Sequence, residues 1–532
     1  RKSLCGRGLY RTIATQIVGK HNRLPDAIPR FHRTKRQCQI AMRLGYNDII
    51  NQRLFPPIFI LGLAGIALSL SMGQLPIAMG LIGLPVLFIM AIQSVRYPVA
   101  LFFIIFTVNY YLLAATRYIQ IDGISFLMDS LMALLFVLII IHSALSKDIE
   151  WKHAINTFTI GMFIWLLYCL AEIANPTGLL EAWLLSRSLI LNGFLISLII
   201  SLVITKNGQV RWIITLLSIF SLSAALKAFA QKYIGFDYGE LQWLNNGGAL
   251  THIIGYGTRY FSFFTDAGNF GSNMGCASLL FALMAIYVSK IGQRIYYFSV
   301  AIICLIAMFM SGTRGAMIVP IGGLMLYTLM SKNLKACILG GLSLIFLYVF
   351  FAFTTIGQSN VMIRRMRTAF TPSEDASFNV RKENRQKLAT YINTRPFGEG
   401  IGLSGVENQK ISYRFTTSIP HDSFYVKIWV ETGIVGAILF FGVYFISVFR
   451  AAWIVMFKVK DKELKGRLTA LLCGIFGMLL SAYGNAFLGQ FPTYIIVITG
   501  ITLALKGEYF DKEISETNKL NANNDKIPDI IP

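Results

Sequence analysis

The sequence predicts an all-α, polytopic integral membrane protein with about 12–14 transmembrane helices and a large outer loop between late helices. The chain has 532 residues, of which 55% are hydrophobic and only 14% charged, and its mean hydropathy is +0.59. A soluble domain carries about 25% charged residues. Apolar runs of about 18 residues recur from Leu54 to Leu505, each long enough to cross a bilayer as a helix. A soluble globular enzyme is therefore excluded.

Apolar runs separated by charged breaks give fourteen candidate spans. Several are short or contain Gly and Pro, so their ends can shift and one run can be re-entrant. The candidate spans are 54–71, 76–93, 98–115, 126–143, 154–174, 188–204, 211–230, 268–288, 295–310, 316–331, 336–353, 423–449, 468–485 and 491–505.

The connectors between these spans alternate in charge. With the N-terminus inside, the short inner connectors hold fifteen basic residues, and the short outer connectors hold three, Arg117, Arg187 and Arg314. Short cytoplasmic connectors collect Lys and Arg, so the pattern predicts that both termini are cytoplasmic. The alternation also supports the span count, because one missed span would place every later connector on the wrong side.

The net charge of +22 comes from 48 basic and 26 acidic residues. Residues 1–53 contribute 12 basic and 2 acidic residues of these, which predicts a basic cytoplasmic segment rather than a nucleic-acid site. Two interpretations of residues 1–41 remain open: they form a native tail, or Met42 is the natural start. The polar tail, 506–532, is expected to be disordered and cytoplasmic.

Two long loops, 231–267 and 354–422, are predicted to lie outside, and long loops commonly carry function. His421 lies in the second loop, between Pro420 and an apolar helix. A neutral imidazole at the start of a membrane helix can act as a general base, and the helix dipole favours the neutral form. The alternative is a solvated loop histidine beside a helix cap, Asp422. His252 is expected to be an ordinary loop residue.

Arginines facing the outer surface form a second group. Arg259 and Arg314 flank predicted spans, and Arg381 and Arg385 are four residues apart, which places them on one face if that segment is helical. A guanidinium suits the oxygens of pyrophosphate, and an arginine near a span needs an anionic partner. The alternatives are contacts with lipid head groups or with loop carboxylates.

The remaining charged and glycine-rich motifs predict structural features and no further binding or catalytic site. Lys427 and Glu431 are one turn apart and are expected to neutralise each other. The glycines of PFGEGIGLSG (396–405) lack the strand and the GK[ST] of a nucleotide site. The outer loops contain no D-x-D, and no Cys/His spacing suits a metal, so neither a metal nor another cofactor is expected.

Four pieces of the sequence together resemble the O-antigen ligase family, which also includes O-antigen polymerases and some protein O-oligosaccharyltransferases. The resemblance covers roughly 230–445, with the pieces in the family order. The pieces are RYFSFFTDAGNFGSNMG (259–275), SGTRGA (311–316), RPFGEGIGLSG (395–405) and HDSFYVKIWVETGIVG (421–436). Two departures are an Asp at residue 422, where the family has Asn, and more spans than the roughly twelve expected of ligases.

The resemblance implies a glycosyltransferase of the bacterial inner membrane that acts at the periplasmic face without a metal. Its donor would be a glycan on undecaprenyl pyrophosphate, and its acceptor lipid A-core, a polysaccharide or a protein. His421 is similar to the family histidine that activates the acceptor hydroxyl, and Arg259 to an arginine that binds the donor pyrophosphate. Arg381 is a weaker match to a second arginine, and Arg314 matches the turn motif. Arg385 is also expected to bind the pyrophosphate, because it is four residues from Arg381.

The chain is expected to have five parts. These are a cytoplasmic segment (1–53), N-terminal membrane helices (54–230), a ligase-like catalytic region (231–445), C-terminal membrane helices (446–505) and a cytoplasmic tail (506–532). The rival hypotheses are a flippase or transporter of lipid-linked oligosaccharide and a scaffold of a polysaccharide export complex. The cationic and imidazole groups cluster in outer loops, whereas a flippase needs charged groups in a central cavity, which favours the enzyme.

Overall fold

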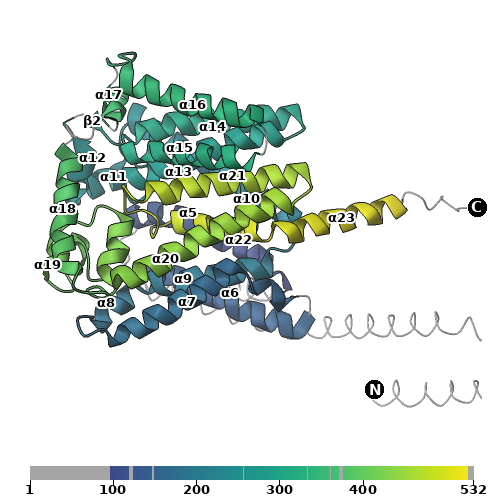
Figure 1. Ribbon diagram of the computed structural model, residues 1–532, viewed down its shortest axis with the longest axis horizontal. Coiled ribbons are helices and arrows are strands. Elements are labelled where there is room, and N and C mark those ends of the chain that lie inside the picture. The colour runs from purple at the N-terminus through teal and green to yellow at the C-terminus, as the bar shows by residue number, and fades with distance from the viewer. Residues whose placement is uncertain are drawn as a thin grey trace, which may run out of the picture. The chain divides into compact units, whose positions relative to one another are not determined.

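The computed structural model describes residues 96–118, 124–146, 149–255, 257–331, 334–359, 361–368, 370 and 376–524. The predicted spans 54–71 and 76–93 and the basic segment 1–53 lie outside the described residues. Every other predicted span coincides with a helix (Figure 1). These helices are α5 Pro98–Tyr118, α6 Ile124–Ser146, α7 Thr157–Ala171, α9 Arg187–Val203, α10 Asn207–Tyr233, α13 Ala267–Tyr287, α14 Ile291–Met310, α15 Ile318–Met330, α16 Leu334–Phe353, α20 Phe424–Phe457, α21 Lys462–Ser481 and α22 Thr493–Leu505.

The predicted fold class, an all-α polytopic membrane protein, is confirmed. Nine helices in the described part of the chain are long and apolar enough to cross a membrane. Two further apolar helices, Arg314–Met330 and Thr493–Leu505, are shorter. The described strands are limited to the antiparallel pair β1 (Ile253–Ile254) and β2 (Gly257–Thr258).

Helices α13 and α21 form the centre of the bundle, where 83% and 89% of their apolar windows are buried. Small residues let the neighbouring helix α15 approach them. A β-carbon at Gly477 of α21 would lie 2.0 Å from the carbonyl oxygen of Val319 in α15. One at Gly323 of α15 would lie 2.2 Å from Leu279 in α13. Glycine at these positions is therefore required by close helix packing.

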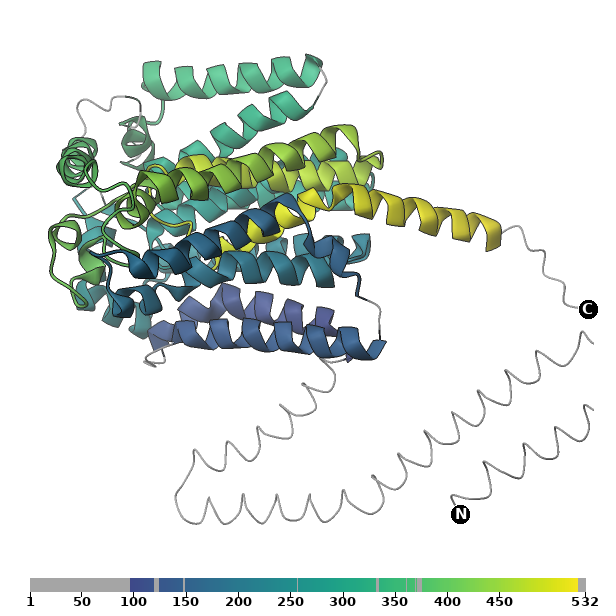
Figure 2. The same cartoon turned by 60° about the horizontal axis from the view of Figure 1, so that its bottom comes forward.

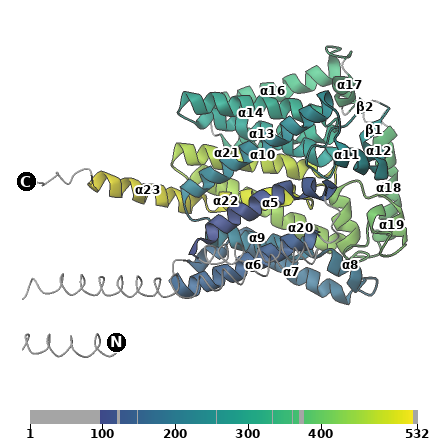
Figure 3. The same cartoon turned by 180° about the vertical axis from the view of Figure 1, so that it is seen from behind.

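The two long loops contribute short elements to one end of the bundle, at the left of Figure 1. The first loop forms α11 (Tyr238–Trp243), α12 (Ala249–His252) and the β1–β2 pair, and the second forms α17 (Val361–Arg367), α18 (Ala376–Ile392) and α19 (Phe415–Ser418). The connector between α7 and α9 adds α8 (Leu180–Leu185) at the same end. Figures 2 and 3 show the long helices running side by side from this end to the opposite one.

The prediction that the whole tail, 506–532, is disordered is wrong for its first part. Residues Gly507–Asn524 form helix α23, which leaves the end of the bundle opposite the long loops. Its acidic side chains bond to exposed backbone N–H groups at helix starts: Asn207 N–H donates to Glu513 Oε2 (3.2 Å) and Asp461 N–H to Asp511 Oδ1 (2.7 Å). Composition alone could not show these partners.

Candidate functional site

A cavity of about 460 Å³ lies at the loop end of the bundle. Its walls come from the turn before α15, the start of α15, helix α18, the residues before α20 and the connector after α21. Four of the five site residues predicted from the sequence line this cavity: Arg314, Arg381, Arg385 and His421. They come from three separate stretches of chain, so the fold brings together groups that are up to about a hundred residues apart in sequence.

Arg381 and Arg385 reach the cavity from α18, whose helical conformation places these two residues on one face. Arg381 Nη1 donates to the backbone carbonyl oxygen of Gly484 at 2.9 Å. The Arg385 guanidinium lies over the Tyr483 ring, 4.7 Å from its centroid, and donates to the Tyr483 hydroxyl. These contacts fix both guanidinium groups against the α21–α22 connector while leaving most of their N–H donors available.

Arg314 lies in a short 3-10 turn, Arg314–Met317, that leads directly into α15. Its Nη1 donates to Thr368 Oγ1 at 2.9 Å, which ties this turn to the segment between α17 and α18. The next residue, Gly315, has no room for a side chain, because a β-carbon would lie 2.2 Å from Asn485 Nδ2. The tight turn therefore holds Arg314 at the cavity wall.

Arg259 does not line the cavity, although the sequence predicted it as a pyrophosphate ligand. Its Nη2 donates to Thr313 Oγ1 at 2.8 Å and its Nη1 to the Thr251 carbonyl at 3.0 Å. Burial lowers the pKa of Arg259, and the positive charges of Arg381 and Arg314 lower it further, while Asp266 opposes them. Arg259 thus lies outside the cavity lining but close enough to Arg381 and Arg314 to add to the positive potential there.

His421 lines the cavity with a side chain that is only 8% exposed. Burial, with a further contribution from Lys427, lowers its pKa from 6.5 to about 4, although Glu407 and Asp422 oppose the shift. Its Nε2 is 3.7 Å from Glu407 Oε1, beyond hydrogen-bond distance, and its buried Nδ1 has no hydrogen-bond partner. The imidazole is therefore neutral at pH 7 and has a free nitrogen lone pair, as a general base requires.

Gly405, at the end of the glycine-rich loop, makes the position of His421 possible. This glycine has a φ of +81°, and a β-carbon on it would lie 2.4 Å from His421 Nδ1. A second glycine, Gly433 (φ +65°), breaks helix α20 inside its residue range. At this break Glu399 N–H donates to the Val430 carbonyl at 2.9 Å, so the loop docks on the broken helix.

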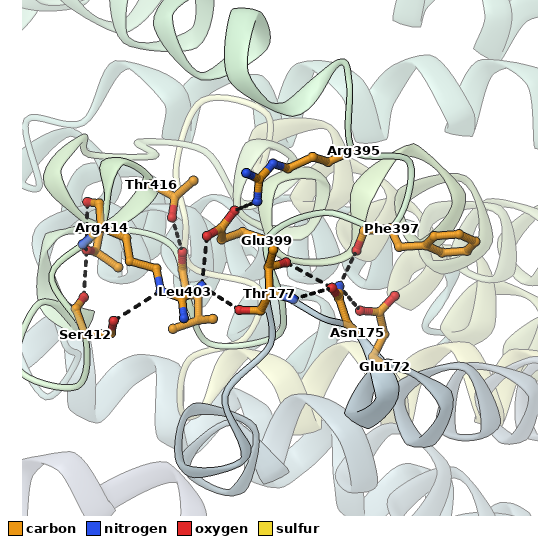
Figure 4. Close-up of polar contacts among 11 residues, drawn as sticks. Glu172, Asn175, Thr177, Arg395, Phe397, Glu399, Leu403, Ser412, Arg414 and Thr416 are labelled. Atoms are coloured by element: carbon orange, nitrogen blue, oxygen red, sulfur yellow. Dashed lines mark hydrogen bonds and ion pairs between the residues drawn. The ribbon is translucent and has the colours of Figure 1, made fainter.

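A buried carboxylate, Glu399, fixes the same loop (Figure 4). Arg395 Nη1 bonds to its Oε2 at 2.5 Å and Arg414 Nη1 to its Oε1 at 2.9 Å. The loop also contacts the connector after α7, where Asn175 Nδ2 donates to Glu172 Oε2 (2.9 Å) and to the Phe397 carbonyl (3.3 Å). These contacts hold the glycine-rich loop in the shape that supports His421.

Two other predictions concern charged or titratable residues near this end. Lys427 Nζ lies 3.9 Å from Glu431 Oε1, consistent with the predicted pair, but the shorter contact to that oxygen comes from Ser404 Oγ at 2.8 Å. His252 is buried rather than an ordinary loop residue. Its Nε2 accepts a hydrogen bond from Ala267 N–H at 3.1 Å, so it fixes the start of α13.

The cavity also contains functional groups that the sequence did not indicate. Lys382, Asp422 and Tyr483 line it as well. The lining thus has four cationic side chains and one carboxylate. Such a surface favours a ligand with at least two negative charges, such as a pyrophosphate diester.

These features define a polytopic helical membrane protein with a cavity at one end of the bundle that is lined by cationic side chains and a neutral histidine. Residues 299–441 match the family model described as O-antigen ligase, which confirms the family resemblance over this part of the chain. The matched region includes Arg314, α18 and His421 and excludes the motif that begins at Arg259. No curated protein matches the chain.

Proposed function

We propose that this protein is a glycosyltransferase that moves a glycan from undecaprenyl pyrophosphate to an acceptor hydroxyl at the periplasmic face of the bacterial inner membrane. The observation that carries the proposal is the shared cavity, where Arg314, Arg381 and Arg385 face the same space as a buried, neutral His421. The family match over 299–441 supports O-antigen ligase or polymerase chemistry.

The arginines would hold the pyrophosphate through charge-assisted hydrogen bonds. The acceptor oxygen attacks the anomeric carbon and forms the new glycosidic bond, while the bond from that carbon to the phosphate oxygen breaks. The acceptor hydroxyl proton goes to His421, and the electron pair leaves with undecaprenyl pyrophosphate, whose growing charge the arginines stabilise. A single displacement of this kind inverts the anomeric centre.

The proposed reaction uses side-chain chemistry and no metal or other cofactor. In the described ranges, no group of three or more His, Cys, Asp or Glu side chains is placed to bind a metal ion. In this proposal the cationic side chains that line the cavity neutralise the pyrophosphate, a role that metal ions take in other enzymes. Activity that survives exhaustive treatment with a chelator would support this part of the proposal, and restoration by added divalent cation would contradict it.

The periplasmic orientation is supported by the distribution of basic residues. The cavity lies at the end of the bundle that carries the two long loops, whereas Arg450, Lys458 and Lys460 lie near the opposite end, where α20 finishes. Short connectors rich in Lys and Arg remain in the cytoplasm. We therefore propose that both termini are cytoplasmic. Topology reporters fused after residues 146 and 458 should report the cytoplasm, and a reporter inserted in 406–412 should report the periplasm.

A transfer assay in detergent tests the enzyme against the rival flippase. Purified protein is mixed with lipid-linked glycan and a separate acceptor, without any sealed compartment. An enzyme forms product under these conditions, and a flippase forms none. Product formation by the wild type supports the proposal, and its absence with every acceptor class, together with glycan-lipid translocation in sealed vesicles, would contradict it.

Deletion of the gene distinguishes the three acceptor classes within the proposed chemistry. A ligase mutant loses glycan from lipid A-core, a polymerase mutant shows single unpolymerised units, and a protein transferase mutant has bare glycoproteins. Unchanged surface glycans in all three fractions would contradict the proposed function.

A further inference from the structure

The carboxylate of Glu407 lies beside the imidazole of the proposed base, His421. Its Oε1 is 3.7 Å from His421 Nε2. Gly405 lies against both side chains, because a β-carbon built on it would be 2.4 Å from His421 Nδ1 and 2.6 Å from Glu407 Oε2. In the part of the chain that the structure describes, no lysine or arginine pairs with Glu407. The imidazole is therefore the group with which this carboxylate can pair.

A short turn after the glycine-rich loop fixes the backbone of Glu407. This 3-10 turn, Val406–Asn408, follows Gly405 directly. The Asn408 N–H donates to the Gly405 carbonyl at 3.0 Å, and its Nδ2 donates to the Ser404 carbonyl at 2.7 Å. The turn thus keeps the carboxylate close to the imidazole, although the Glu407 side chain is 58% exposed.

The charges around His421 give this carboxylate a role. Cationic side chains line the cavity that the imidazole shares, and Lys427 adds a further positive charge. Burial and Lys427 lower the pKa of His421 to about 4, and Glu407 opposes the shift more than Asp422 does. Asp422 Oδ2 also accepts a hydrogen bond from Asn384 Nδ2 at 3.2 Å. A protonated imidazole at this position therefore depends mainly on Glu407 for its counter-charge.

We propose that Glu407 is a positioning residue for the transfer reaction: its carboxylate orients the His421 imidazole and stabilises the imidazolium that forms when the acceptor hydroxyl loses its proton. The inference rests on the proposed function, because it takes His421 as the base. The acceptor proton moves to an imidazole nitrogen as the acceptor oxygen bonds to the anomeric carbon, and the electron pair leaves with undecaprenyl pyrophosphate. The new positive charge lies beside the carboxylate, with 3.7 Å between Nε2 and Oε1. The imidazolium then returns its proton to water, which reaches the exposed Glu407 side chain.

Glu407→Gln removes the charge and keeps the size of the side chain. We expect kcat to fall about tenfold, the effect of losing one opposite charge about 4 Å from the imidazolium once bound substrate displaces water. The donor Kd and the acceptor KM should stay near their wild-type values, because Glu407 does not line the cavity. Glu407→Asp keeps a carboxylate and should lower kcat by no more than about threefold.

A purely structural role of Glu407 predicts a different result. Because the side chain is 58% exposed, Glu407→Gln should keep the wild-type Tm. The matched control is Glu383→Gln in α18, which removes a carboxylate that is 62% exposed at the same end of the bundle. This control should transfer glycan at the wild-type rate. Equal rates for the two glutamine variants, or equal losses in Glu407→Gln and Glu407→Asp, would overturn the proposal.

Titration of His421 tests the pairing without catalysis. NMR spectra are recorded on the purified full-length protein with isotope-labelled histidine, and the His421 signal is identified by its absence from His421→Gln. In Glu407→Gln the pKa of the imidazole should fall further, by roughly half a pH unit for a pair that solvent screens. An unchanged titration would overturn the proposal even if glycosyl transfer is confirmed.

A shifted titration in a wild type that transfers no glycan would leave the Glu407–His421 pair standing and reject the proposed function. The two failures are therefore distinguishable.

Discussion

The imidazole of His421 packs so closely on Gly405 that a β-carbon at residue 405 would lie 2.4 Å from its Nδ1. The glycine-rich loop thus forms one side of the histidine site. The loop in turn is held by the Glu399 ion pairs and by the break in α20 at Gly433. Substitutions in this loop should therefore affect the proposed base, His421, without changing the arginines that line the cavity.

Substitution of Gly405 by Ala should impair transfer strongly. The new β-carbon would displace the imidazole, and its positive φ costs about 1–3 kcal/mol for a residue other than glycine. We expect kcat to fall at least about tenfold with donor affinity nearly unchanged, since a misplacement of about 1 Å can cost a hundredfold. The control is Gly442→Ala, a helical position with no neighbouring atom within 4 Å, which should retain full activity. Equal activity of both variants would contradict the role of Gly405.

Arg381→Ala and Arg385→Ala should weaken donor binding. A hydrogen bond to a charged group contributes about 1.5–3 kcal/mol, so we expect Kd for polyprenyl pyrophosphate to rise roughly 10- to 100-fold in each variant. Arg385→Lys should recover little, because lysine cannot reproduce the planar contact with the Tyr483 ring. Equilibrium binding of labelled donor measures this effect. Arg450→Ala, at an exposed position near the opposite end, is the control and should bind normally.

The low pKa of His421 predicts an unusual pH dependence. Because the folded pKa is about 4, below the usual 6.5, the imidazole stays neutral and kcat/KM should not fall as the pH drops from 7 to 5.5. The stability of the fold, in contrast, should depend on pH in this range. The unfolded histidine binds a proton below about pH 6.5 and the folded one does not, so the free energy of unfolding decreases as the pH falls from 6.5 towards 4. His421→Gln should remove that part of the loss in thermal melts, and an unchanged pH dependence of the melts would contradict the assigned shift.

Substitution of Glu399 by Ala should destabilise the loop end of the bundle. It would leave Arg395 and Arg414 without their shared carboxylate, a loss of about 1–3 kcal/mol because water can reach the two partly exposed guanidinium groups. We expect a lower Tm and faster proteolysis between α18 and α20. Glu383→Ala, which removes an exposed pair with Lys387, is the control and should change Tm little. Similar melts for the two variants would contradict the structural role of Glu399.

The membrane helices could be predicted from the sequence because an apolar run of membrane length has few alternatives to a helix. Their ends were less certain. The predicted span 468–485 ends in the structure at Ser481, which frees Tyr483 and Gly484 for the cavity wall. The composition of the tail does not predict helix α23, because its acidic side chains bond to backbone N–H groups of other segments, which composition does not show.

Part of the candidate site could also be predicted. The spacing of Arg381 and Arg385 identifies a shared face wherever the segment is helical, and Pro420 marks the start of the helix that follows His421. Whether a given arginine reaches a cavity wall depends on packing between distant segments. Arg259 is an example: the structure places it against the Gly312 turn and outside the cavity lining, with its donors directed to Thr313 and Thr251.

The most direct test compares donor binding and glycan transfer in the same preparation of His421→Ala. The account predicts that this variant binds polyprenyl-pyrophosphate-linked glycan with a Kd near that of the wild type but forms product at a rate reduced by a factor of about 100 or more. His153→Ala, a histidine outside the cavity, should bind and transfer normally. Wild-type transfer by His421→Ala would contradict the central claim that this imidazole accepts the proton of the acceptor.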